Sequence, residues 1–224
     1  MKKPYIICHM MTSADGRIDC AMTEQLPGVS DYYKTLDELN VPSTLSGRVT
    51  AELEMADKGF FEATDPTKFG KEGFKKNSDA DGYEIVTDTN GKLLWHNSDD
   101  EKPYLIITSE NVTCEYLRYL DENGISWIAC GKDKIDLPRA CEILYESFGV
   151  ERMGVVGGPA INTAFLNNGL LDEISLLIGA GIDGRADMPS VFDGRDMSYP
   201  LTALRLTDVE KFDSGAVWLR YKTK

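Results

Sequence analysis

The stretch MGVVGGPAINTAFLNNGLLDEISLLIGAG, residues 153–181, decides the fold predicted for this chain. Its first apolar run, around Val155 and Val156, stops at two adjacent glycines, Gly157 and Gly158. A helix-compatible segment follows, and then a second apolar run begins. Strand, helix and strand in this order predict part of an α/β sheet, whose parallel strands are joined through helices.

The double glycine also allows a ligand to approach the backbone closely. In an α/β sheet, the loop after the carboxyl end of a strand opens into the ligand crevice. The next helix presents free N–H groups and the positive end of its dipole, which suits a phosphate group. Pro159 fits the first helical turn because it has no N–H to satisfy. The pair could equally make only a tight strand-to-helix turn, and it matches neither G-x-G-x-x-G nor a P-loop.

The rest of the chain continues the alternation of strands and helices. Apolar, β-branched runs predict strands over residues 4–10, 102–110 and 125–131. Periodic segments with Asp, Pro or Gly at their ends predict four further helices, over residues 31–39, 48–57, 113–123 and 137–148, the last two followed by Gly124 and Gly149.

Two segments are predicted as hairpins. Residues 83–95 hold two strand-like runs around Asn90-Gly91, and residues 201–222 hold two around Asp213-Ser214-Gly215. Residues 62–82 are polar and predict a long loop or lid. We therefore expect one α/β domain over residues 1–224, with a mainly parallel central sheet flanked by helices and a C-terminal antiparallel hairpin.

Composition narrows the classes of function. The chain has 224 residues, of which 42% are hydrophobic, which is enough for one substantial core. Its net charge of -13 argues against nucleic acid as a partner. No apolar run approaches the ~18 residues of a membrane span, and the start of the chain lacks the apolar region of a signal peptide. We expect a cytoplasmic protein without membrane contact.

Metal and disulfide chemistry are not indicated. The five cysteines form no C-x-x-C pair, and the two histidines, His9 and His96, lie far apart in the sequence. Cys8 and Cys130 lie in apolar runs and are predicted to be small buried side chains.

Three shorter motifs lie where strands are predicted to end or helices to begin. Gly47-Arg48-Val49-Thr50 could hold a phosphate, or be an ordinary helix start with a surface arginine. Thr108-Ser109 ends a buried strand and could bind a ribose phosphate, or form a capping turn. Ser13-Ala14-Asp15-Gly16 could hold a sugar hydroxyl or a cationic group, or be a simple Asp-Gly turn. Asp172-Glu173 is placed at the amino end of the last parallel strand, away from the crevice.

Four segments together resemble a known family. MTSADGRID, SGRVTAE, YLIITS and VVGGPAINTAFLNNGLLDEISLLIGAGIDG are similar to the C-terminal-like domains of RibD, the riboflavin-pathway reductases, which share the dihydrofolate reductase fold. The resemblance covers roughly residues 4–222, and its last segment is the most specific. It implies a dihydrofolate reductase-like fold and an NADPH-dependent reduction, in riboflavin synthesis that of the ribosyl group of 5-amino-6-(5-phosphoribosylamino)uracil to ribityl.

The resemblance also implies where the cofactor binds. Gly47, Arg48 and Thr50 match the family's cofactor-binding G-R-x-T. Thr108 and Ser109 match the strand end near the adenosine 2′-phosphate. The turn that holds the pyrophosphate corresponds to four consecutive residues, Gly157, Gly158, Pro159 and Ala160.

On the substrate side, Ser13, Asp15 and Gly16 match the family's S-x-D-G segment. The implied mechanism is direct hydride transfer, in which orientation and electrostatics provide most of the rate. Asp15 is the candidate for orienting the substrate or relaying the accompanying proton, and bound water is an alternative donor. Family members commonly pair through a sheet edge, so the resemblance also implies a homodimer.

The sequence departs from the family at two places. Riboflavin reductases usually carry Glu immediately before the glycine pair, where this chain has Val156, as dihydrofolate reductases have an apolar residue. Residues 62–98 are interpreted as an insert relative to short reductases. Two alternatives therefore stay open: a dihydrofolate reductase-like enzyme acting on a pteridine, and a nucleotide-binding protein without catalysis.

Overall fold

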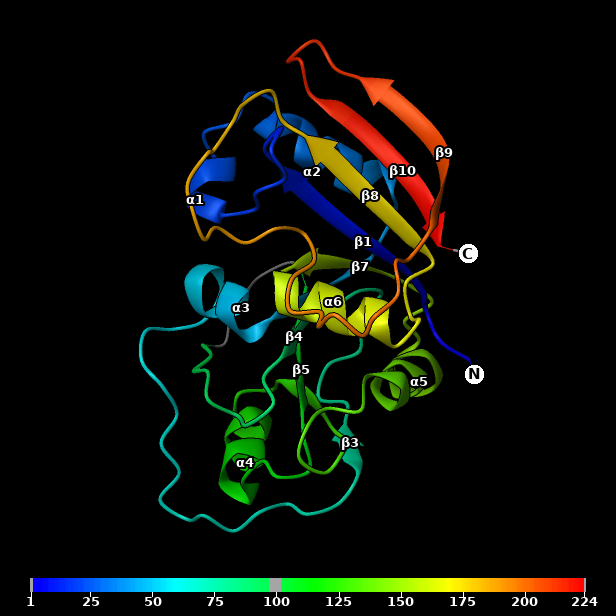
Figure 1. The fold of residues 1–224 in the computed structure, drawn as a ribbon. Helices are drawn as coiled ribbons and strands as arrows, with labels where there is room; N and C mark the ends of the chain where they lie inside the picture. The colour runs from blue at the N-terminus through cyan, green and yellow to red at the C-terminus, as the bar shows by residue number, and fades with distance from the viewer. Residues whose placement is uncertain (1, 97–101, 224) are drawn as a thin grey trace. The chain divides into compact units, whose positions relative to one another are not determined.

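The computed structural model describes residues 2–96 and 102–223. The chain divides into two compact units. The first contains the N-terminal residues up to Pro4 and residues 42–153, and the second contains residues 5–41 and the chain from Gly154 onward. Each unit is built on its own set of adjacent strands (Figure 1).

In the first unit the strands lie in the order β3-β6-β5-β4-β2. Their bounds are β2 Ser43–Gly47, β3 Gly73–Lys75, β4 Glu84–Thr87, β5 Tyr104–Thr108 and β6 Ser126–Ala129. β2, β4, β5 and β6 run parallel to their neighbours, and β3 pairs antiparallel with β6. The helices of this unit are α3 Arg48–Glu54, α4 Cys114–Glu122 and α5 Leu137–Phe148.

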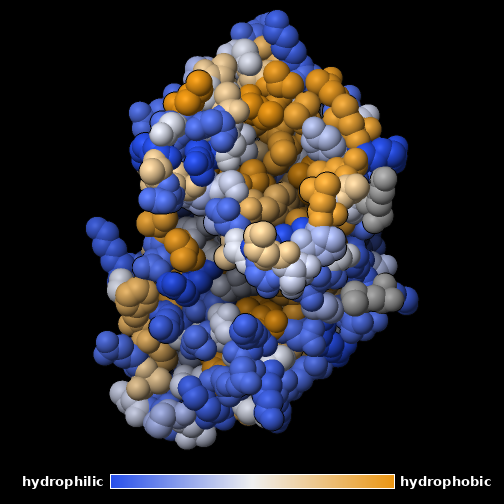
Figure 2. Space-filling view, in the orientation of Figure 1, coloured by the Kyte–Doolittle hydropathy of each residue, from blue (hydrophilic) through white to orange (hydrophobic). Residues whose placement is uncertain are grey.

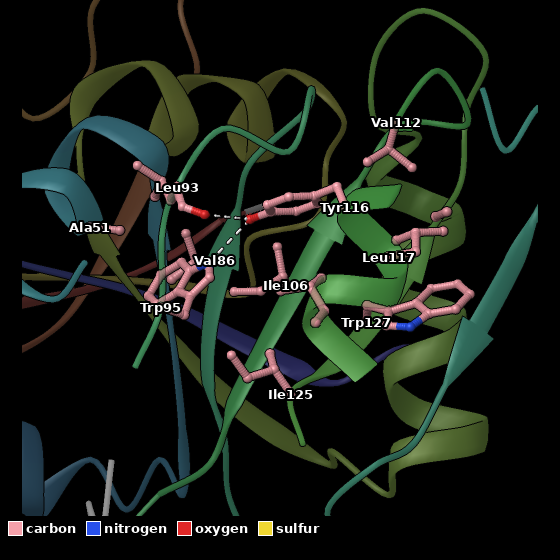
Figure 3. Close-up of a cluster of buried hydrophobic side chains, with 12 residues drawn as sticks. Ala51, Val86, Leu93, Trp95, Ile106, Val112, Tyr116, Leu117, Ile125 and Trp127 are labelled. Carbon is pink, nitrogen blue, oxygen red and sulfur yellow. Dashed lines mark hydrogen bonds between the residues drawn. The ribbon is translucent and has the colours of Figure 1, made fainter. Parts of the chain in front are cut away.

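The core of the first unit gathers the aromatic and aliphatic side chains of β4, β5, β6 and α4 (Figure 3). Ile106 of β5 and Tyr116 of α4 are fully buried, and Trp95 and Trp127 nearly so. The Tyr116 hydroxyl donates to the Leu93 carbonyl at 3.0 Å and accepts from the Trp95 indole at 3.1 Å. The polar end of this buried ring is thus satisfied, as a buried tyrosine requires.

In the second unit the strands lie in the order β7-β1-β8-β10-β9, and the first two residues of β7 are assigned to the first unit. Their bounds are β1 Tyr5–Thr12, β7 Arg152–Gly157, β8 Glu173–Ile178, β9 Leu204–Lys211 and β10 Val217–Thr223. β1 and β8 are parallel, and β8, β10 and β9 follow in antiparallel pairs. The helices are α1 Cys20–Thr23, α2 Val29–Glu38 and α6 Pro159–Asn167. Tyr32 and Leu36 of α2 pack on the core around Ile7 and Trp218.

The predicted fold class is confirmed by this arrangement. Most strand pairs are parallel, the helices alternate with strands along the chain, and the C-terminal hairpin is β9 and β10. Cys8 and Cys130 are buried free cysteines, as expected. In residues 2–96 and 102–223, no helix is long and apolar enough to cross a membrane. Over the same residues, no cluster of three metal-ligating side chains occurs.

The hairpin predicted around Asn90-Gly91 is wrong. A turn forms there, with the Gly91 amide donating to the Asp88 carbonyl at 3.0 Å. However, β4 is paired on both sides, by β2 and β5, so no edge is left for the residues after the turn. Instead, the chain after the turn is held by the Asp88 carboxylate, which accepts hydrogen bonds from the amides of Lys92 and Leu93.

Other boundaries also differ from the predictions. Gly47 ends strand β2, which the sequence did not indicate, because Ser43–Gly47 is short and rich in small polar residues. α2 begins at Val29, two residues before the predicted Asp31, after a left-handed Gly28. α3 ends at Glu54 rather than at residue 57. Strand β3 lies inside the segment predicted as a loop.

The prediction of one domain over residues 1–224 stays a prediction, and so does the insert at residues 62–98. Residues 97 and 98 lie outside the described part of the chain. The described part of that interval contains β4, which has a strand on each side.

Candidate functional site

The first unit gathers several of the predicted residues at one edge of its parallel strands. Gly47 at the end of β2 lies opposite Thr87 of β4, and Thr87 lies opposite Ile107 of β5, the residue before Thr108. Gly47 is also the residue immediately before α3, where it has an extended conformation and no side chain that could cap the helix. The carboxyl ends of β2, β4 and β5 therefore meet where the sequence predicts a nucleotide.

Arg48 contributes a cationic side chain to this edge. Its guanidinium donates to the Glu52 carboxylate one helical turn later, at 2.5 Å, and both side chains are 38% exposed. Such an exposed ion pair contributes little to stability, so the arginine can exchange partners at low cost. Thr50 lies two residues further on and is half-buried.

Thr108 and Ser109 are both fully buried. The Thr108 hydroxyl donates to the Ile128 carbonyl at 3.3 Å, and the Ser109 hydroxyl donates to the Thr89 carbonyl at 2.9 Å. Both hydroxyl protons are thus taken by the backbone of neighbouring segments. Their role as ligands of a 2′-phosphate stays a prediction, and in this geometry they shape the strand end.

Asp88 is a residue of this edge that the sequence analysis missed. Its carboxylate is fully buried directly after β4, and its Oδ2 accepts from the amides of Lys92 at 2.6 Å and Leu93 at 2.8 Å. Its buried Oδ1 has no partner in the described residues. An Asp that follows a strand and precedes Asn-Gly was a usable signal for such a turn-organising carboxylate.

The second unit holds the double glycine. Gly157 ends β7 with φ 128°, a backbone conformation that favours glycine, and its peptide bond to Gly158 is cis. Gly158 immediately precedes α6, Pro159 is the first residue of the helix, and Ala160 is exposed. No side chain caps this helix, and no acidic residue lies in its first turn. Its N-terminal amides are therefore left to an external acceptor or to water.

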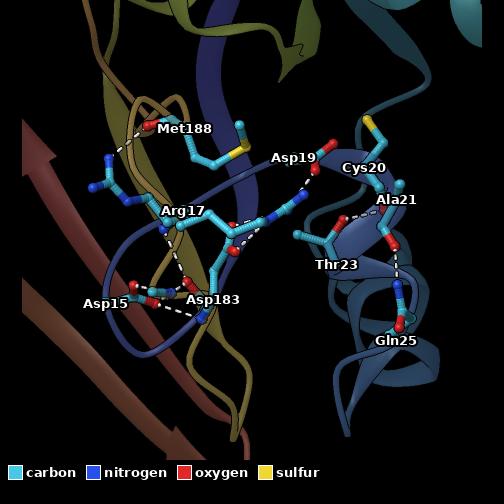
Figure 4. Close-up of polar contacts among 12 residues, drawn as sticks. Asp15, Arg17, Asp19, Cys20, Ala21, Thr23, Gln25, Asp183 and Met188 are labelled. Carbon is cyan, nitrogen blue, oxygen red and sulfur yellow. Dashed lines mark hydrogen bonds and ion pairs between the residues drawn. The ribbon is translucent and has the colours of Figure 1, made fainter.

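The Ser13–Gly16 segment forms a turn after β1 that carries Asp15 (Figure 4). Gly16 takes φ 83° in this turn. The Asp15 carboxylate accepts from the Ser13 hydroxyl at 2.6 Å and from the amides of Asp183 and Gly184 at 3.0 and 2.9 Å. The hydrogen bonds, first that from Ser13, hold the pKa of Asp15 well below its usual range. At neutral pH Asp15 is an ionised acceptor that ties this turn to the loop after β8.

Asp172 and Glu173 lie at the amino end of β8, as expected. Asp172 accepts from the Ile6 amide at 2.8 Å. Glu173 is 2% exposed and accepts from Arg220 at 2.7 Å and from the Tyr5 hydroxyl at 3.1 Å. Both carboxylates therefore serve the packing of β1, β8 and β10.

Comparison with known sequences gives one consistent result. A family model described as the RibD C-terminal domain matches residues 4–218. The 2,5-diamino-6-ribosylamino-4(3H)-pyrimidinone 5′-phosphate reductase of Archaeoglobus fulgidus is 25% identical over 98% of this chain and 99% of its own length. The protein of the same name from Methanothermobacter thermautotrophicus is 31% identical over 48% of this chain and 49% of its own length.

Solved structures with the same fold cover the whole chain. A pyrimidine reductase-like protein of Corynebacterium diphtheriae has a TM-score of 0.70 at 17% identity, with 93% of that chain covered. RibD of Acinetobacter baumannii has a TM-score of 0.73 at 18% identity, with 59% covered. The riboflavin biosynthesis reductase Rib7 of Saccharomyces cerevisiae has a TM-score of 0.61 at 18% identity, with 91% covered. At these identities the likeness is one of fold.

Proposed function

Because this chain belongs to the RibD C-terminal domain family, we propose that it is an NADPH-dependent reductase of a riboflavin-pathway pyrimidine. The proposed substrate is 2,5-diamino-6-ribosylamino-4(3H)-pyrimidinone 5′-phosphate, the compound in the names of the curated relatives. Its deaminated counterpart, 5-amino-6-(5-phosphoribosylamino)uracil, is the substrate that the sequence resemblance implied. In either compound the ribosyl group would be reduced to ribityl.

The observation that carries the cofactor assignment is the turn from Gly157 into α6. Gly157 takes a conformation that glycine favours, and the first turn of α6 has neither a side-chain cap nor an acidic residue. The partial positive charge of a helix N-terminus stabilises an anion placed there. Residues 157–160 therefore fit a pyrophosphate, and the proposal assigns that group to them.

The remaining predicted residues are assigned roles in positioning the cofactor or the substrate. Bound NADPH supplies a hydride. Gly47 leaves room at the start of α3, while Arg48 and Thr50 offer a guanidinium and a hydroxyl to the nucleotide. Thr108 and Ser109 shape the adjacent strand end. The ionised Asp15, with Ser13 and Gly16, orients the substrate, and water supplies the accompanying proton because Asp15 has none to give near neutral pH.

The first experiment is a titration of the purified protein with NADPH and with NADH, read by thermal shift and fluorescence. Turnover is then followed by the loss of reduced-nicotinamide absorbance with the two pyrimidines and with dihydrofolate. NADPH binding with turnover of a pyrimidine is the expected result. Reduction of dihydrofolate alone would support the pteridine alternative that Val156 left open, and binding without turnover would support a non-catalytic role.

Replacing Arg48 by glutamine is expected to weaken NADPH binding by about tenfold and to leave NADH binding nearly unchanged. The guanidinium would contact the 2′-phosphate that only NADPH carries, and a charge-assisted contact of this kind is worth roughly 1–2 kcal/mol. Dissociation constants of both cofactors test this. Equal losses for NADPH and NADH would remove the phosphate role from Arg48.

We also propose that the chain forms a homodimer through β9. β9 is the edge strand of the sheet, and all eight of its residues are exposed. Three of them are apolar: Leu204, Leu206 and Val209. Leu206 and Val209 lie opposite Tyr221 and Leu219, so one face of the hairpin is apolar. Figure 2 shows hydrophobic residues, in orange, gathered over this part of the second unit. An apolar face at an unpaired edge is typical of an association surface.

The double substitution L206K/V209K is expected to convert the dimer to a monomer, because two charges would have to be buried in the interface. Analytical ultracentrifugation measures the mass of both proteins. Leu53→Lys is the control, since Leu53 is 74% exposed on α3, and it should leave the dimer intact. A monomeric parent protein, or a double variant that stays dimeric, would contradict this surface.

A further inference from the structure

A groove of about 470 Å³ lies within the second unit. One side is formed by α1 and the segment after it, through Met22, Leu26 and Pro27. The other side is formed by the loop after β8, through Ile182 and Arg185. The volume is in the range of small-molecule sites, roughly 300–1,000 Å³.

The loop side of this groove is held in place by the Ser13–Gly16 turn. The Asp15 carboxylate accepts from the amides of Asp183 and Gly184, and the Ala14 amide donates to the Gly181 carbonyl at 2.7 Å. A side chain at Gly181 would meet Leu26 at 2.5 Å, so glycine keeps the two sides close. The groove is therefore adjacent to the turn that the proposed function places on the substrate side.

Arg185 is the cationic residue of the groove lining, which also includes the polar residues Gln25 and Asp183. Its guanidinium contacts both oxygens of Asp183, and its Nη2 donates to Asp19 at 2.6 Å. The Asp183 side chain is 2% exposed, whereas that of Arg185 is 50% exposed. Within the described chain, Nη1 of Arg185 makes no hydrogen bond. The two carboxylates thus fix the guanidinium plane and leave one donor and part of its surface to a ligand.

The apolar part of the lining is formed by Ala21, Met22, Leu26, Pro27 and Ile182. Ile182 is 79% exposed, although its neighbours are tied to the Ser13–Gly16 turn. Met22 has a flexible thioether, a group that makes favourable contacts with the edges of flat rings. A fixed guanidinium plane likewise stacks on flat rings and donates to a carbonyl. Together these groups suit a planar ring that carries a carbonyl.

We propose that this groove binds the pyrimidine ring of the substrate, with the ring between the apolar wall and the Arg185 guanidinium and its carbonyl accepting from Nη1. The inference rests on the proposed function, because the ligand proposed for the groove is the substrate of that function. The groove would recognise a carbonyl-bearing nitrogen heterocycle, and both proposed pyrimidines have one.

The test uses the free base 5,6-diaminouracil, which lacks ribose and phosphate, with binding measured by calorimetry. Arg185→Gln and Arg185→Lys are each expected to weaken its binding about tenfold, since lysine keeps the charge but loses the planar fork. Ile182→Ala should weaken it by a smaller factor. Arg139→Gln is the matched control: Arg139 is also held by two carboxylates, Glu72 and Glu142, is 39% exposed, and lies in the first unit.

With the full substrate, the Arg185 variants should raise KM about tenfold and leave the dissociation constant of NADPH unchanged. Binding of the base that is unaffected in both Arg185 variants would overturn the inference. So would a loss that appears only in NADPH binding, which would assign the groove to the cofactor. Failure of the proposed function is seen separately, as absence of NADPH-dependent turnover in the parent protein, because the binding of the base is measured without turnover.

Discussion

The Gly157→Ala variant is expected to bind NADPH about a hundredfold more weakly than the parent protein and to lose kcat/KM in proportion. Gly157 has φ 128°, where an L-residue is strained by roughly 1–3 kcal/mol. The added methyl group would also stand on the turn that leads to the uncapped amides of α6. An anion held by backbone amides needs close approach to the main chain, and a side chain prevents it.

The control for this variant is Gly169→Ala. Gly169 also has a positive φ, 64°, but it follows the other end of α6, and a methyl group there would meet nothing within 4 Å. It should lower the melting temperature by a few degrees, as a strained backbone does, without changing NADPH affinity. A Gly157→Ala protein that is folded and binds NADPH as the parent does would reject the pyrophosphate assignment.

The free energy of unfolding is expected to fall by about 3 kcal/mol between pH 7 and pH 4 through one residue, His9. His9 is fully buried in β1 and makes hydrogen-bond contacts with the hydroxyls of Ser175 at 2.9 Å and Thr35 at 3.2 Å. Its ring stacks on Tyr32 with centroids 4.7 Å apart. Burial lowers the pKa of His9 from 6.5 to about 4.

The direction of this change in the free energy of unfolding follows from which state, folded or unfolded, binds the proton of His9. Between pH 6.5 and pH 4 the unfolded chain protonates His9, whereas the folded chain keeps the ring neutral, so acid favours unfolding in this window. Above pH 6.5 both states are neutral at this residue, and the contribution no longer changes with pH. Arg220 adds to the lowering because its charge repels an imidazolium.

Urea denaturation at several pH values tests this prediction on the parent and on His9→Gln. The parent should lose stability more steeply between pH 6.5 and pH 4, and the difference between the two slopes is the contribution of His9. His96→Gln is the control, since it removes an imidazole that is 55% exposed and, within the described chain, contacts the exposed carboxylate of Asp57 at 2.8 Å. Equal slopes for the parent and His9→Gln would contradict the prediction.

Much of the fold could be read from the sequence because strands buried on both faces are continuous apolar runs. Such runs predicted β1, β5, β6, β7 and β8, and the turn at residues 213–215 predicted the β9–β10 hairpin. β2 was missed because Ser43–Gly47 has only one large apolar residue, Leu45. Its strand conformation comes from pairing with β4, far along the chain.

The candidate site was predicted less completely. The positions of Thr108, Gly157 and Asp15 at or just after the ends of strands follow from local patterns, since each comes after an apolar run, whereas the strand that Gly47 ends was not predicted. The hydrogen-bond partners of their polar groups do not follow from local patterns. That Asp15 accepts from the amides of Asp183 and Gly184, or that Ser109 donates to Thr89, depends on segments brought together by packing.

The sequence by itself determined the order of strands and helices, the parallel character of the sheet and the C-terminal hairpin, because side-chain period and turn chemistry act over a few residues. Only the tertiary structure decided that Asn90-Gly91 starts no hairpin and that the Asp15 carboxylate accepts from the loop after β8. It also decided that Arg185 is held by two carboxylates at the side of a groove. These outcomes depend on which edges and which hydrogen-bonding groups remain unpaired after distant segments have packed, and local sequence does not encode that.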